Sequence, residues 1–149
     1  MTSPTLPSSR PMLHAAGDGR RDFGLLLDHG PFAPATARHQ ARPVLTSWGL
    51  DEEQIYDTLL VISELVTNAV THALPPVVLH LHAGADNCGR IQIHVSDGGP
   101  QTDPASWAAA RPSDEHGRGA AIISALTDGT GAAPDGDGLI DRWADLDAA

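Results

Sequence analysis

The sequence predicts an α+β fold in which helices cover one face of a mixed, mostly antiparallel sheet. Between residues 52 and 74, apolar residues recur at three- and four-residue steps, which is the period of a helix. Two alternating runs follow, at residues 77–83 and 90–96, and they show the two-residue period of strands. The order of helix, hairpin, long loop, helix and strand favours helices packed on one side of the sheet.

The length and charge of the chain limit its possible functions. The 149 residues fit one domain with a substantial core. The formal net charge is −10, with 9 basic and 19 acidic residues, which disfavours nucleic acid as a partner. Every basic residue is Arg, so a Walker-type phosphate loop, which requires Lys, is excluded.

Cysteine usage and hydropathy indicate a cytoplasmic protein that is not inserted in a membrane. Cys88 is the single cysteine, which excludes an internal disulfide and a thiolate zinc cluster. No run approaches the roughly 20 apolar residues that a membrane-spanning helix requires, and the first residues lack the apolar centre of a signal peptide.

The first half of the chain divides into a tail, a strand and two helices. Residues 1–20 are rich in Pro, Ser and Gly and are expected to be a disordered tail before a domain at 21–149. The apolar run at 22–28 predicts a strand. The spacing at 34–48 predicts a helix in which Pro43 implies a kink or a late start.

The best-defined element is the helix that Asp51 is expected to cap, with Glu52 and Glu53 in its first turn and Pro75-Pro76 beyond its end. One stripe of this helix should pack against the sheet. Its members are Ile55, Leu59, Ile62, Leu65, Val66, Ala69 and Ala73.

The second half begins with a hairpin whose inward residues are expected to be Leu79, Leu81, Ile91, Ile93 and Val95. The Gly-, Pro- and Asp-rich segment 98–116 is long enough to be a lid or binding loop. A helix is predicted from 117 to 126 and a last strand from 139 to 146, with its inward face undetermined.

Three polar residues in the long helix, Glu64, Asn68 and His72, are spaced i, i+4 and i+8 and so share one face. Polar groups in so apolar a helix need partners, and a cation with its water and phosphate would be one. Asn offers a neutral oxygen to Mg²⁺, and Glu can accept a proton from an attacking hydroxyl. Alternatively, the three residues line a solvated edge of the helix.

Two later motifs favour a nucleotide site. Asp97-Gly98-Gly99 ends a strand, where a carboxylate can accept a hydrogen bond from an amino group such as that of adenine. Gly117-Arg118-Gly119 precedes an apolar helix, whose N-terminus and Arg118 can bind phosphate. Taken alone, the first motif is an ordinary turn and the second a flexible loop.

Together, over about residues 32–146, these motifs resemble the GHKL superfamily of ATPases and kinases, and most closely the anti-sigma-factor serine/threonine kinases among actinobacterial ATP-binding regulators. The N box of that family is matched by residues 64–73, ELVTNAVTHA. Its D-x-G box is matched by 97–99, its G-R-G-L box by 117–119 with Ala120 in place of Leu, and its closing W-A-E-L strand by 143–146.

The resemblance implies a Bergerat-type two-layer sandwich that binds ATP and Mg²⁺. It implies Glu64 as the catalytic base and Asn68 as the Mg²⁺ ligand. It further implies ATP contacts from Asn68, His72, Asp97, Gly99, Gly117, Arg118 and Gly119.

The implied function is a partner-switching regulator of transcription that phosphorylates an anti-anti-sigma protein and binds a sigma factor. A homodimer is expected by analogy with the family. The family's G-K-x-V-W entry to the last strand is here 138–143, without Lys and with added charge, and its Asp-Trp-Gly stretch is here 128–131. The altered strand motivates an alternative: a non-catalytic ATP-binding or nucleotide-free module of the same fold.

His80, His82 and His94 are expected together on the polar side of the hairpin. Because no cysteine or nearby carboxylate completes a ligand set in the sequence pattern, an exposed polar face is favoured over a zinc site.

Overall fold

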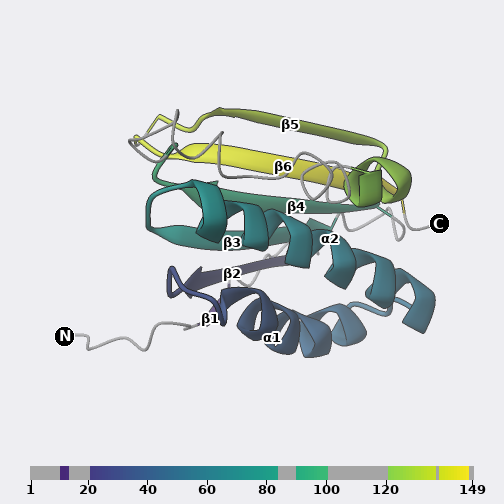
Figure 1. The fold of residues 1–149 in the computed structure, drawn as a ribbon. Helices are drawn as coiled ribbons and strands as arrows, with labels where there is room; N and C mark the ends of the chain where they lie inside the picture. The colour runs from purple at the N-terminus through teal and green to yellow at the C-terminus, as the bar shows by residue number, and fades with distance from the viewer. Residues whose placement is uncertain (1–10, 14–20, 84–89, 101–120, 137, 148–149) are drawn as a thin grey trace.

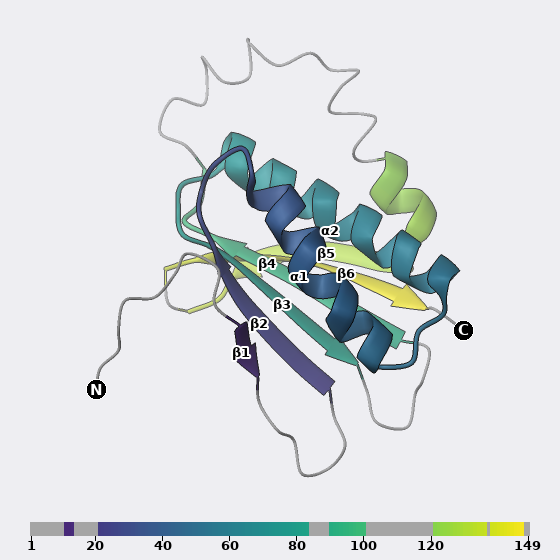
Figure 2. The same cartoon turned by 90° about the horizontal axis from the view of Figure 1, so that it is seen from below.

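The computed structural model describes residues 11–13, 21–83, 90–100, 121–136 and 138–147. These residues form two layers, a six-stranded sheet and a layer of helices on one of its faces (Figures 1 and 2). The sheet order is β1-β2-β3-β4-β6-β5, and neighbouring strands are antiparallel in every described pair. The α+β sandwich is therefore confirmed, whereas the sheet is antiparallel throughout these pairs rather than mixed.

Four strands were expected from the sequence and two were not. The expected ones are β2 (Arg21–Leu27), β3 (Val77–Ala83), β4 (Arg90–Asp97) and β6 (Ile140–Asp147). The unexpected ones are the edge strands β1 (Pro11–Leu13) and β5 (Gly129–Pro134). Because β1 pairs with β2, residues 11–13 belong to the sheet and not to a disordered tail.

Helix α1 (Ala33–Ser47) is continuous, although Pro43 lies inside it. The late start is therefore wrong, because the helix begins one residue before Pro34, where the fixed φ of proline suits the first turn. The kink at Pro43 stays a prediction. Small and apolar residues at four-residue spacing face inward and hold the helix against α2 and β2. These buried residues are Ala33, Ala37, Ala41 and Leu45.

Helix α2 (Glu52–His72) begins at the predicted cap. The Asp51 carboxylate accepts from the Gln54 backbone N–H at 2.8 Å, and the Gln54 side chain accepts from the Asp51 backbone N–H at 2.8 Å. This reciprocal pair is a capping box. The predicted apolar stripe of the helix is buried along its whole length, together with Thr58 and Val61, and it packs against β3, β4 and β6.

The inward faces of β3 and β4 complete the core as predicted, because the alternating residues named above are all buried. Ala144 and Leu146 are also buried, which settles the inward face of β6. Residues 121–126 form a helix whose Ile123 and Leu126 pack on this core. Residues 117–120, where the same helix was expected to begin, lie outside the described part of the chain.

Candidate functional site

Helix α2 presents the three predicted polar residues at one side of the core. Glu64, Asn68 and His72 are each half-buried, so none of them lies on a fully solvated edge. No hydrogen bond or ion pair joins Glu64 or Asn68 to another residue of the described part. Within the described part of the chain, a ligand would therefore displace no partner from their oxygen atoms.

The segment after β4 is held in place by the Asp97 side chain and by the backbone of Leu74. One carboxylate oxygen of Asp97, Oδ1, accepts from the Gly99 backbone N–H at 2.8 Å, and Gly99 has a φ of +92° that favours glycine. The Gly98 N–H donates to the Leu74 carbonyl at 2.7 Å, and the Leu74 N–H donates to the Gly99 carbonyl at 2.8 Å. These bonds join the end of β4 to the residues just after α2.

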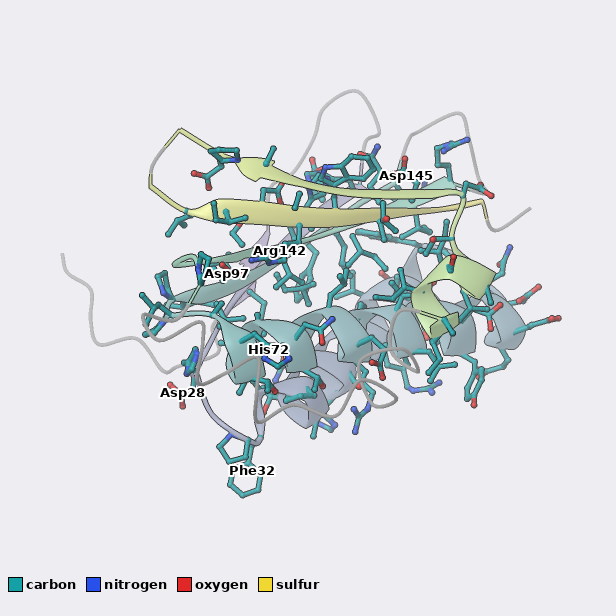
Figure 3. The ribbon with its side chains drawn as sticks, turned by 45° about the horizontal axis from the view of Figure 1, so that its top comes forward. Asp28, Phe32, His72, Asp97, Arg142 and Asp145 are labelled. Atoms are coloured by element: carbon teal, nitrogen blue, oxygen red, sulfur yellow. The ribbon has the colours of Figure 1, made fainter. Side chains whose placement is uncertain are left out.

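Asp97 is fully buried and it is paired with an arginine from the neighbouring strand. Its second oxygen, Oδ2, accepts from Nε of Arg142 at 2.9 Å. Figure 3 shows the two side chains next to each other between the sheet and α2. The carboxylate predicted to accept from a ligand thus has both oxygens bound within the chain.

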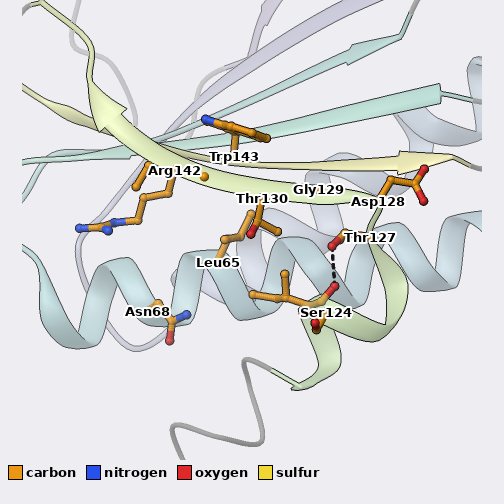
Figure 4. A pocket seen from close by; sticks show the side chains of 12 residues that line it. Leu65, Asn68, Ser124, Thr127, Asp128, Gly129, Thr130, Arg142 and Trp143 are labelled. Atoms are coloured by element: carbon orange, nitrogen blue, oxygen red, sulfur yellow. Dashed lines mark hydrogen bonds between the residues drawn. The ribbon is translucent and has the colours of Figure 1, made fainter.

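A pocket of about 640 Å³ opens between α2, the helix at 121–126 and the edge of the sheet formed by β5 and β6 (Figure 4). This volume is in the range typical of small-molecule sites. In Figure 4, Asn68 from α2 and Arg142 from β6 lie toward the same end of it. The lining residues are Leu65, Asn68, Ile123, Ser124, Thr127, Asp128, Gly129, Thr130, Gly131, Ala132, Arg142 and Trp143.

The pocket contains one of the predicted site residues and lies beside others. Asn68 lines it directly, whereas Glu64, His72, Asp97 and Gly99 are not part of its lining. Arg142 links the two, because it lines the pocket and its Nε binds Asp97. The predicted phosphate motif, Gly117, Arg118 and Gly119, and the predicted lid lie outside the described residues.

Two components of the site were not predicted from the sequence. The wall formed by β5 was not expected, since GTGAAP has no alternating pattern. Arg142 was noted only as extra charge in the last strand. Its alternation with Ala144 and Leu146 was a usable signal, because it places a cation on the inward face of β6.

The three histidines lie on the opposite face of the sheet, as predicted. His80 stacks on His82 at 6.1 Å between ring centroids, and His82 meets His94 edge to face at 5.3 Å. His82 Nδ1 is paired with Asp22, and His94 Nδ1 with Asp141 at 2.9 Å. No group of three or more His, Cys, Asp or Glu side chains in the described part has the arrangement of a metal site.

The described residues therefore form an α+β two-layer sandwich with an antiparallel sheet, helices on one face and a pocket beside the polar edge of α2. The model of the histidine kinase-like ATPase domain family matches residues 31–140, well over half of the chain. The protein therefore belongs to the histidine kinase-like ATPase domain family, the GHKL-type fold that its motifs resemble.

A solved structure has the same fold. It is the crystal structure of the RsbU and RsbW domains of Rv1364c from Mycobacterium tuberculosis, with a TM-score of 0.60 and 24% sequence identity. The match covers 83% of this chain and 32% of that one, so the present chain corresponds to about a third of the solved protein. No curated protein sequence matches. None of the described helices is long and apolar enough to cross a membrane.

Proposed function

We propose that this protein is an ATP-binding serine/threonine kinase of the anti-sigma-factor type, which regulates transcription by switching between protein partners. The carrying observation is the pocket beside Asn68, on the helix that holds the N-box sequence of an ATPase-domain family. The described pocket and fold support nucleotide binding. The anti-anti-sigma substrate and the sigma-factor partner rest on the motif resemblance, as do the homodimer and the cytoplasmic location.

Asn68 fits the role of magnesium ligand. Its side chain is half-buried at the pocket wall and has no hydrogen-bond partner among the described residues, so its carboxamide oxygen is free to bind a hard cation. Bound Mg²⁺ would neutralise charge on the transferring phosphoryl group. His72 lies one turn further along the same helix face, and Gly117, Arg118 and Gly119 are proposed to contribute phosphate contacts.

Glu64 is proposed as the general base. It lies one helical turn before Asn68 on the same face of α2, so a serine hydroxyl brought to a phosphate bound at Asn68 could pass its proton to this carboxylate. The hydroxyl oxygen forms a bond to the γ-phosphorus, the bond to the β-phosphate oxygen breaks, and the hydroxyl proton passes to Glu64. ADP and a phosphoserine are the products.

Measuring phosphotransfer by the Glu64→Gln variant tests whether Glu64 is the general base. The substitution keeps the size of the side chain but removes its capacity to accept a proton, and we expect phosphorylation to fall about 100-fold or more. ATP carrying a labelled γ-phosphate and the anti-anti-sigma proteins of the same genome provide the assay.

The matched control is Glu53→Gln, an exposed carboxylate in the first turn of the same helix. It should phosphorylate at the rate of the natural sequence. Unchanged phosphorylation by Glu64→Gln would show that Glu64 is not the base.

A second candidate function is a non-catalytic module of the same fold that acts by protein contact. The observation that favours it is the pairing of Asp97 with Arg142, which engages the carboxylate expected to bind adenine. If this candidate is right, no anti-anti-sigma protein will be phosphorylated, and Glu64→Gln will leave partner binding unchanged.

A further inference from the structure

Asp97 is the one charged side chain that is fully buried in the described part of the chain, with 0% exposed surface. Its two oxygens accept from the Gly99 N–H and from Nε of Arg142, at 2.8 and 2.9 Å. A carboxylate can accept further hydrogen bonds, but only from groups that can reach it. With no exposed surface, Asp97 cannot meet a nucleobase in this arrangement.

Arg142 binds Asp97 and also lines the pocket, whereas Asp97 does not line it. In the pairing of β4 with β6, Val95 lies opposite Arg142 and Asp97 lies opposite Ile140, so Asp97 and Arg142 are diagonal neighbours on the inward face. The Arg142 side chain is 33% exposed and lines the pocket, while its Nε binds the buried carboxylate.

The position is unusual for a cation. Ala144 and Leu146, the next two residues on the same face of β6, are both buried and apolar. An inward-facing arginine is stable there because it is paired with a carboxylate by a charge-assisted hydrogen bond. The charged group therefore belongs to a specific pair and is not a solvated surface residue.

Resting on the proposed ATP site, we propose that Arg142 limits the affinity for ATP because its guanidinium competes with the adenine amino group for Asp97. A nucleotide with an adenine base reaches its full affinity only when the Arg142 guanidinium leaves Oδ2 of Asp97 and the adenine amino group takes its place. The pair thus lowers the affinity for ATP, because a charge-assisted hydrogen bond is exchanged for one from a neutral donor.

The direction of the effect distinguishes this role from a simple ligand contact. ATP is an anion, so removing a cation from its site should weaken binding by Coulomb attraction alone. Competition for Asp97 predicts the opposite result. A gain in ATP affinity on loss of Arg142 is therefore specific to the proposed competition.

The test is isothermal titration with Mg²⁺·ATP of the natural sequence, Arg142→Met and Arg142→Gln. We expect ATP to bind Arg142→Met at least about tenfold more tightly than the natural sequence, because the buried carboxylate then lacks its charged partner. Arg142→Gln retains a neutral donor for Asp97 and should show a smaller gain, which keeps the test valid if the Met variant folds poorly.

The matched control is Arg90→Met. Arg90 lies on β4, on the other face of the sheet, where it pairs with Asp145 at 3.9 Å. This variant changes the net charge equally and should leave ATP affinity unchanged. Thermal unfolding of each variant checks that it is folded.

The outcomes separate the inference from the proposed function. If the natural sequence binds ATP and neither variant binds it more tightly, the competition is refuted and the ATP site stands. If both variants bind ATP more weakly, Arg142 is a ligand contact and the inference is wrong. If no protein binds ATP, the ATP-dependent function and the inference both fail, since opening the site should have allowed binding.

Discussion

Gly98 lies at a close approach between the end of β4 and the residues that follow α2. A Cβ atom at this position would be 2.3 Å from the Pro75 carbonyl oxygen and 2.9 Å from that of Leu74. Both are backbone atoms, so a side chain cannot be accommodated by a rotamer change. The second residue of the Asp-Gly-Gly motif is therefore required by contacts within the chain, independently of any ligand.

Gly98→Ala is expected to destabilise the protein by about 1–3 kcal/mol, because the added methyl group forces the backbone at 74–75 away from the turn. Urea unfolding followed by circular dichroism measures the change. Gly30→Ala is the control, since a Cβ atom there has no neighbour within 4 Å. Equal unfolding midpoints for the two variants would contradict the steric argument.

The positions of some polar residues of the site can be predicted from the sequence, and those of others cannot. Glu64, Asn68 and His72 follow from helical spacing, which is local, and the structure finds them on α2 as expected. The bond between Asp97 and Arg142 joins residues 45 positions apart and depends on the register of β4 with β6. Because that register is a tertiary property, the motif indicated a carboxylate for a ligand but not its partner within the chain.

At the scale of elements, the start of α2 is a local and testable structure. The Asp51 carboxylate accepts from the Gln54 N–H, and Glu52 and Glu53 occupy the positive first turn. Asp51→Ala should lower the free energy of unfolding by about 1 kcal/mol, because the N–H loses its partner. Glu53→Ala serves as the comparison in chemical denaturation and should cost less. A smaller loss for Asp51→Ala would mean that the cap contributes little.

The elements that were predicted from the sequence have strong local hydrophobic patterns, and the elements that were not predicted lack such patterns. The hairpin of β3 and β4 alternates clearly, with every second residue buried. Strand β5 is an edge strand that is mostly exposed, so it buries no face that an alternating apolar pattern would mark. Strand β1 has three residues, and only its pairing with β2 defines it. In α1, packing on α2 and β2 outweighs the helix-breaking tendency of Pro43.

At the scale of the whole molecule, the pocket lies where segments distant in sequence meet. Its walls come from α2, the helix at 121–126, and β5 with β6. None of residues 121–134 is buried, whereas α2 is anchored in the core by its buried stripe. A nucleotide in this pocket would hold the C-terminal segments against α2. Ligand binding and the stability of the domain are therefore expected to be coupled.

This coupling gives a prediction for thermal unfolding. With Mg²⁺·ATP at 100 times its dissociation constant, the folded state should gain about 2.7 kcal/mol. For a chain of this size the gain raises the unfolding midpoint by about 5–10 °C. Asn68→Ala should abolish most of the shift, because the proposed magnesium ligand is lost. Its ligand-free midpoint should stay close to that of the natural sequence, since no hydrogen bond joins Asn68 to another described residue. An equal shift in both proteins would place the nucleotide or its metal away from Asn68.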